Sequence, residues 1–204
     1  MVHSSVWRMA AVAGVLFAAT GCLDDLEDPI GPPISGFEPG VVLEASGGLQ
    51  GSIVISEETA LALRTPRQWV NPGWVFEGAR ADQTTWSGSL VMVARGPAEA
   101  GSDWSFFQPM PGEDWENEGT DIISILDEGT AYLVLNYSGT YGDMSLLSVS
   151  GTVEVAETSD DWVAGYITVS MIEQIFETGE IPENAREATL EGTFNVQIST
   201  MGEL

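Results

Sequence analysis

One short pattern recurs along the chain and limits what it can fold into. In each copy a glycine stands between positions at which apolar residues alternate with other residues. Alternation with a period of two is typical of a β-strand with one buried face, and the copies are rich in Val, Ile, Thr and aromatic residues. The constant glycine predicts bulges or bends that let a sheet curl. The copies are Leu49–Ile55, Trp86–Met92, Val149–Val155, Val163–Val169 and Leu190–Val196.

Turn signals separate further strands of the same kind. We expect strands at Asp121–Leu126 and Thr130–Tyr137, joined into a hairpin by Asp127-Glu128-Gly129, because turns of this chemistry with flanking alternation favour hairpins. Thr158–Asp161 is expected to link two of the recurring strands in the same way. Helical patterns are scarce, and we expect only one or two short helices, at Ser56–Leu63 and Ser170–Glu177.

Sequential strands with short polar turns make antiparallel pairing the expected arrangement. The sequence therefore predicts an all-β fold, an antiparallel β-sandwich or a flattened barrel of about 8–10 strands. The copies are unevenly spaced, which argues against a solenoid or a propeller.

The first residues read as a targeting segment. Arg8 precedes Met9–Thr20, an unbroken run of apolar or small residues that is too short to span a bilayer. Ala19-Thr20-Gly21-Cys22 resembles the lipobox of bacterial lipoproteins, which implies cleavage before Cys22 and lipidation of that residue. Cys22 is the only cysteine in the chain. The alternative is an ordinary secretory signal that is cut after Gly21.

These features divide the chain into three parts. We expect a signal peptide at 1–21, a tether rich in Pro, Gly and acidic residues at 22–40, and a single β domain at 41–204. The expected location is the bacterial cell envelope, with the protein lipid-anchored at the outer membrane and facing either the periplasm or the surface.

The last third of the chain resembles a known group of proteins. Ser150–Val155, Val163–Val169 and Glu191–Val196 are similar to the ending of small bacterial lipoproteins of unknown function. Those families combine a lipobox, a Pro/Gly/acidic tether and one all-β domain that ends in Gly-Thr-containing strands. The resemblance implies all-β architecture and brings no catalytic residues with it.

Composition excludes several classes of function. The chain has 31 acidic residues, 6 basic residues and a formal charge of −25, and loss of Arg8 with the signal makes it more negative still. Nucleic acid and anionic lipid surfaces attract basic patches, so we expect neither as a partner. The one histidine, His3, leaves with the signal, and without an imidazole base the usual serine and cysteine nucleophile systems cannot be built. We expect no cofactor.

The stretch from Asp103 to Asp121 breaks the strand pattern and is the candidate ligand site. Aromatic rings beside carboxylates suit a sugar or a cation, through stacking, hydrogen bonds and cation–π contacts. The alternative is that the aromatic residues cap the core and that the acids are solvated. Four acids in this stretch also form a weak calcium candidate, although the spacing is not that of an EF-hand. The ligand candidates are Trp104, Phe106, Phe107, Asp114, Trp115 and Glu116, and the calcium candidates are Glu113, Asp114, Glu116 and Glu118.

We therefore expect a lipid-anchored, extracytoplasmic, non-catalytic domain that has a binding or envelope-structural role, with a glycan or a protein as ligand. The competing expectation is a carboxylate-only glycoside hydrolase, or another carbohydrate-active domain. Two carboxylates that face each other across a cleft would identify such an enzyme.

Overall fold

The computed structural model describes residues 31–64, 73–80, 86–106, 126–175 and 180–200. In these residues the fold is all-β and mostly antiparallel, without an α-helix, which confirms the fold class predicted from the alternating pattern. A short 3-10 turn lies at Glu57–Thr59. The strands are β1 (Gly40–Gly47), β2 (Gly51–Ile55), β3 (Ala60–Arg64), β4 (Gly73–Arg80), β5 (Trp86–Arg95), β6 (Asp103–Phe106), β7 (Thr130–Gly139), β8 (Gly142–Thr158), β9 (Trp162–Gln174) and β10 (Glu187–Thr200).

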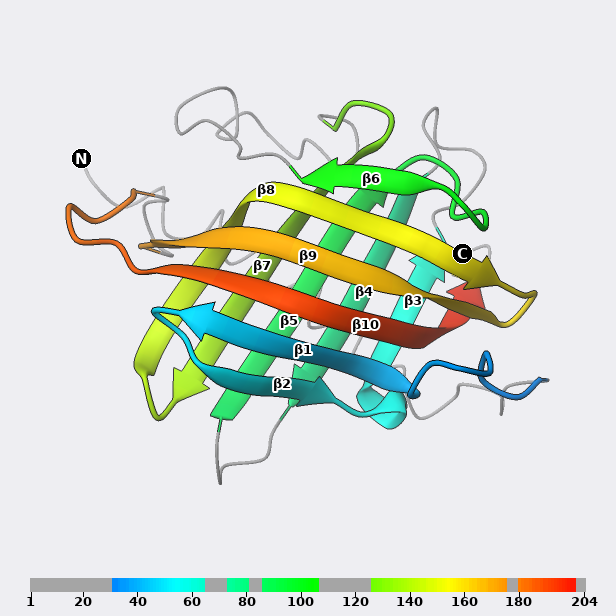
Figure 1. Cartoon of the computed structure of the whole chain (residues 1–204), viewed down its shortest axis with the longest axis horizontal. Helices are drawn as coiled ribbons and strands as arrows, with labels where there is room; N and C mark the ends of the chain where they lie inside the picture. Colours follow the sequence, from blue (N-terminus) through cyan, green and yellow to red (C-terminus); the bar gives the residue numbers. More distant parts are fainter. Residues whose placement is uncertain (1–30, 65–72, 81–85, 107–125, 176–179, 201–204) are drawn as a thin grey trace, which may run out of the picture.

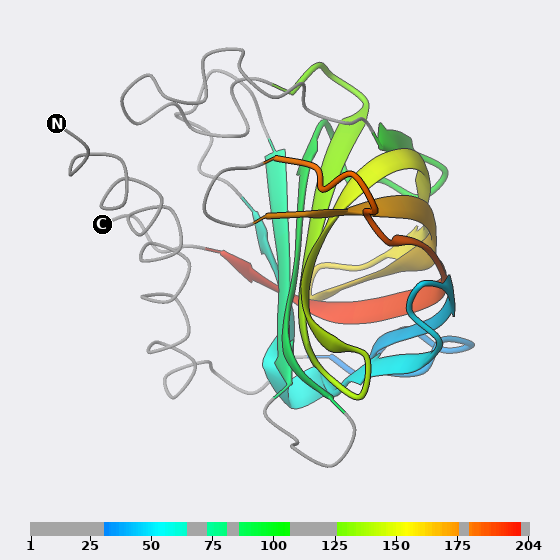
Figure 2. The same cartoon turned by 90° about the vertical axis from the view of Figure 1, so that its left-hand side faces the viewer.

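The strands form two crossed layers (Figures 1 and 2). One layer holds β6, β9, β10, β1 and β2, and the other holds β3, β4, β5 and β7. The long strand β8 serves both layers, because its first residues pair with β7 and its later ones with β9. Strand β10 pairs with β9 and β1 and then, at its end, runs parallel to β3. The sheet is not closed into a barrel, and β2 lies at the end of the strand order.

The core lies between the two layers and follows the period of two. In β7, Ala131, Leu133 and Leu135 are fully buried, and they alternate with residues on the outer face. In β9, Val163 and Val169 face the same core. A second, smaller apolar cluster lies on the outer face of the β5–β7–β8 layer and comprises Val93, Leu126, Tyr132 and Leu147. The described ranges contain no helix that is long and apolar enough to cross a membrane.

Both expected short helices are wrong. At Ser56–Leu63, one 3-10 turn closes with Thr59 N donating to Ser56 O, and β3 follows at once. Ala60 and Ala62 are buried at alternate positions, so burial along one strand face decides the local structure. In the segment Ser170–Glu177, β9 continues through Gln174, because β8 and β10 both offer partners for its backbone groups.

Both expected turns are present, and only the strand expected before the second turn differs. Thr158–Asp161 connects β8 to β9 as an antiparallel hairpin, as predicted. The turn before β7 is also present, with Thr130 N donating to Asp127 O. Leu126, however, lies in a bend rather than a strand, and 121–125 lie outside the described residues.

Candidate functional site

The structure places the described part of the predicted aromatic site in the core. Trp104 and Phe106 are buried on β6, where they alternate with Asp103 and Ser105 on the other face. These two rings therefore cap the core, which was the alternative that the sequence left open. The remaining ligand and calcium candidates, Phe107, Glu113, Asp114, Trp115, Glu116 and Glu118, lie outside the described residues, as does Cys22.

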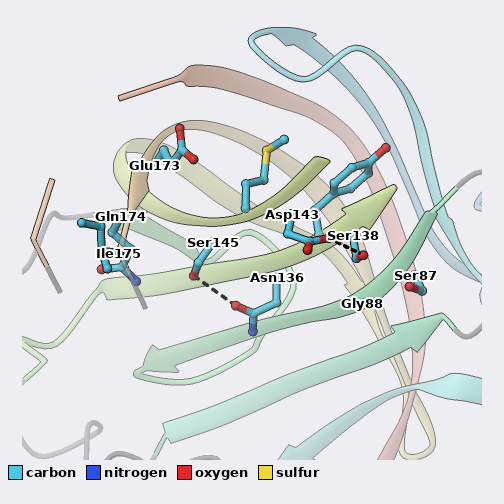
Figure 3. Close-up of a pocket in the computed structure, with 11 residues that line it drawn as sticks. Ser87, Gly88, Asn136, Ser138, Asp143, Ser145, Glu173, Gln174 and Ile175 are labelled. Atoms are coloured by element: carbon cyan, nitrogen blue, oxygen red, sulfur yellow. Dashed lines mark hydrogen bonds between the residues drawn. The ribbon is translucent and has the colours of Figure 1, made fainter. Parts of the chain in front are cut away.

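A different site is formed by the ends of four strands (Figure 3). It is an open groove of about 450 Å³, lined by both polar and apolar residues, which we call the end groove. Its residues come from the start of β5, the end of β7, the start of β8 and the end of β9. The lining residues are Ser87, Gly88, Asn136, Tyr137, Ser138, Asp143, Met144, Ser145, Glu173, Gln174 and Ile175.

A row of polar side chains crosses three strands at this groove. Asn136 pairs in register with Ser89 on β5 and with Ser145 on β8, so the three side chains lie on one face. Asn136 Nδ2 donates to Ser89 Oγ at 3.2 Å, and Ser145 Oγ donates to Asn136 Oδ1 at 3.0 Å. The row fixes the orientation of the Asn136 amide and leaves a surface that can both donate and accept hydrogen bonds.

The acidic wall of the groove consists of Glu173 and Asp143, and Arg186 contacts both residues. Its guanidinium forms a bidentate ion pair with Glu173, with contacts of 2.6 and 2.8 Å, and its Nη atoms donate to Tyr141 O and Asp143 O. This ion pair lowers the pKa of Glu173, chiefly through the side-chain hydrogen bond. Asp143 in turn accepts a 2.6 Å hydrogen bond from Ser138 Oγ. Both carboxylates therefore have partners, and the wall is ordered.

Aromatic rings lie on the core side of β7, opposite the face that carries the polar row. Tyr137 stacks on buried Trp86, with ring centroids 5.9 Å apart and planes 8° apart. On its other side Tyr137 contacts Tyr141, at a centroid distance of 6.4 Å. Tyr141 is 40% exposed and sits in the β7–β8 hairpin, while Ile175, equally exposed, lines the groove at the end of β9. The end groove thus combines hydrogen-bonding groups with the exposed apolar surface of Ile175, and the ring of Tyr141 is not part of its lining.

Within the described ranges, no cluster of His, Cys, Asp and Glu is arranged to hold a metal ion. Sequence reasoning missed the end groove because its residues come from the ends of four strands, spread over 87–175, that only strand pairing brings together. The available signal was local: Asn136 interrupts an apolar run in β7. Comparison with protein-family models, curated proteins and solved structures finds no match to this chain.

Proposed function

We propose that this chain is a lipid-anchored, extracytoplasmic binding domain of the bacterial cell envelope, and that the end groove is its binding site. The anchor is proposed on the targeting pattern that ends at Cys22. Of the two folds predicted, we propose the β-sandwich for the two crossed layers.

The ligand class that fits the groove best is a neutral glycan. The observation that carries this proposal is the hydrogen-bonded row Ser89–Asn136–Ser145, because Asn136 and Ser145 line the groove together with exposed Ile175. Sugar rings present hydroxyl groups to hydrogen-bonding side chains and their apolar faces to apolar side chains. A neutral rather than an acidic glycan is proposed because a formal charge of −25 repels anions.

The competing function, glycoside hydrolysis, has weaker support. Asp143 and Glu173 both line the groove, so carboxylates are present. Such enzymes need one carboxyl group that stays protonated as the general acid. Arg186 has the opposite effect on Glu173, because it lowers the pKa of that carboxyl group.

Titration calorimetry of the full chain with a panel of neutral oligosaccharides tests the proposal. We expect saturable binding that Ile175→Ala, which truncates an exposed side chain of the groove lining, weakens by tenfold or more. Ile181→Ala is the matched control, since Ile181 is an exposed isoleucine that does not line the groove. Absence of binding to every oligosaccharide would contradict a glycan ligand. Release of reducing ends that stops in Asp143→Asn would favour the hydrolase instead.

A further inference from the structure

Part of the expected tether lies against the domain. Residues Gly31–Pro39 precede β1, and three of their backbone carbonyls accept hydrogen bonds from side chains of β9 and β10. We call this segment the strap. Trp162 Nε1 donates to Gly31 O at 3.0 Å, and Asn195 Nδ2 donates to both Ile34 O and Phe37 O, at 3.0 and 3.2 Å. In Figure 1 the strap, in blue, approaches β1 from the side of the β8–β9 turn.

Burial on the outer face of the sheet agrees with these contacts. Ala164 and Asn195 are register partners on the face that points away from the core, yet both are fully buried. Further along the same face of β9, Tyr166 is 48% exposed, and its ring contacts Phe37 at 5.3 Å. An asparagine without exposed surface needs hydrogen-bond partners, and its amide group finds two of them in the strap. The strap is therefore part of the folded domain.

The strap and the end groove lie at opposite ends of β9. The strap meets Trp162, the first residue of β9, whereas the groove is lined by Glu173 and Gln174 at its end. A strand of 13 residues is about 40 Å long at roughly 3.3 Å per residue. The chain that leads back towards Cys22 thus leaves the domain far from its groove.

We propose that the strap sets the orientation of the domain on the membrane, so that the end groove faces away from the bilayer. This inference rests on the proposed lipid anchor at Cys22. From Cys22 to Gly31 the chain can reach about 30 Å at most, even when fully extended. The β8–β9 turn is therefore held near the membrane surface, and the groove, a strand length away, is presented to ligands outside.

Energy transfer from the protein to the membrane tests this orientation. Acylation of Cys22 leaves the mature chain without a free thiol, so an introduced cysteine can be labelled alone. We would place it at exposed Asp160 in the β8–β9 turn or at exposed Glu183 before β10; both changes remove one acidic residue. The lipidated full chain is then reconstituted in phosphatidylcholine vesicles that contain an acceptor-labelled lipid. We expect at least twofold higher transfer efficiency from position 160 than from position 183.

Two replacements separate the strap from the rest of the tether. A Gly/Ser sequence of equal length in place of 31–38 should remove the difference between the two positions. The same replacement of 23–30, with its acidic residues kept, should preserve it. Phe37→Ala is a milder change that should reduce the difference if the full replacement prevents folding.

The possible failures are distinguishable. Equal transfer from both positions in the otherwise unchanged chain overturns the orientation, as does a difference that survives replacement of 31–38. A chain that does not float with the vesicles overturns the lipid anchor, and the orientation with it. Glycan binding by the detergent-solubilised chain is measured separately, so its loss bears on the groove alone.

Discussion

Gly165 lies where two strands come unusually close together. A Cβ atom at this position would be 1.9 Å from the carbonyl oxygen of Glu154 on β8 and 2.9 Å from the ring of Phe194 on β10. Gly192 is in the same situation against Val42 O, at 2.0 Å. Close approach of a neighbouring backbone thus requires the glycine in four of the five copies, at Gly88, Gly151, Gly165 and Gly192, whereas Gly51 has open space and a φ of 108°. Two register shifts, between Ser148 and Ser150 and between Val155 and Glu157, lie at the two ends of the copy that contains Gly151, in agreement with the bulges predicted from the sequence.

Gly165→Ala should therefore destabilise the domain. The added methyl group must displace either the backbone of Glu154 or the ring of Phe194, and we expect a loss of about 2 kcal/mol or more. Urea unfolding measures the change, with Ser170→Ala, at an exposed position of the same strand, as the control. Equal stability of the two variants would show that the strands separate without cost.

Asn195→Asp should release the strap. The substitution removes the amide group that donates to Ile34 O and Phe37 O and places a carboxylate against two carbonyl oxygens. At a fully buried position we expect a loss of about 2–4 kcal/mol. Cleavage after Phe37 by chymotrypsin, followed by mass spectrometry, should become faster. Asn184→Asp, in an exposed turn, is the matched control and should leave the cleavage rate unchanged.

The ends of four elements depend on one arginine. Arg186 precedes β10 and joins the end of β9, through Glu173, to the β7–β8 hairpin, through Tyr141 O and Asp143 O. Because both side chains of the ion pair are partly exposed, solvent screens their attraction. The bidentate geometry raises the contribution of this ion pair to stability. The same geometry orders one wall of the groove.

Arg186→Gln should lower stability by about 1 kcal/mol at pH 7. The pKa of Glu173 is lowered from its ordinary value of 4.5 in the folded protein, so its stabilising effect is complete above pH 4.5 and is lost as the pH falls through the lowered pKa. The stability difference between the parent chain and Arg186→Gln should therefore shrink in acid. Urea unfolding at a series of pH values measures it. A difference that is constant from pH 7 to pH 3 would contradict an ionic contribution.

At the level of elements, the sequence predicted strands better than it predicted their ends and their neighbours. Alternation identified parts of β2, β5, β7, β8, β9 and β10. It failed at Ser56–Leu63, where a short polar turn before two buried alanines resembles the start of a helix. The end groove is a product of pairing: Asn136 meets Ser145 only because β7 and β8 form a hairpin. Arg186 reaches Glu173 only because β9 and β10 are neighbours.

At the scale of the whole molecule, the excess of negative charge acts against the stability of the fold. The 31 acidic residues of the chain greatly outnumber its 6 basic ones, so most carboxylates have no cationic side chain to pair with. Their mutual repulsion opposes the compact state. Moderate salt screens this repulsion, because the Debye length is about 8–10 Å at physiological ionic strength.

The melting temperature of the full chain should therefore rise with added NaCl. Calcium chloride at matched ionic strength distinguishes screening from a specific site, because an ion that binds the native state adds its own stabilisation. If Glu113, Asp114, Glu116 and Glu118 hold calcium, millimolar calcium should stabilise far more than sodium does, and replacing these four acids with amides should abolish the excess. We expect equal effects of the two salts, since screening requires no organised ligands. A melting temperature that responds to neither salt would contradict the repulsion argument, because it would mean that the carboxylates are already well separated.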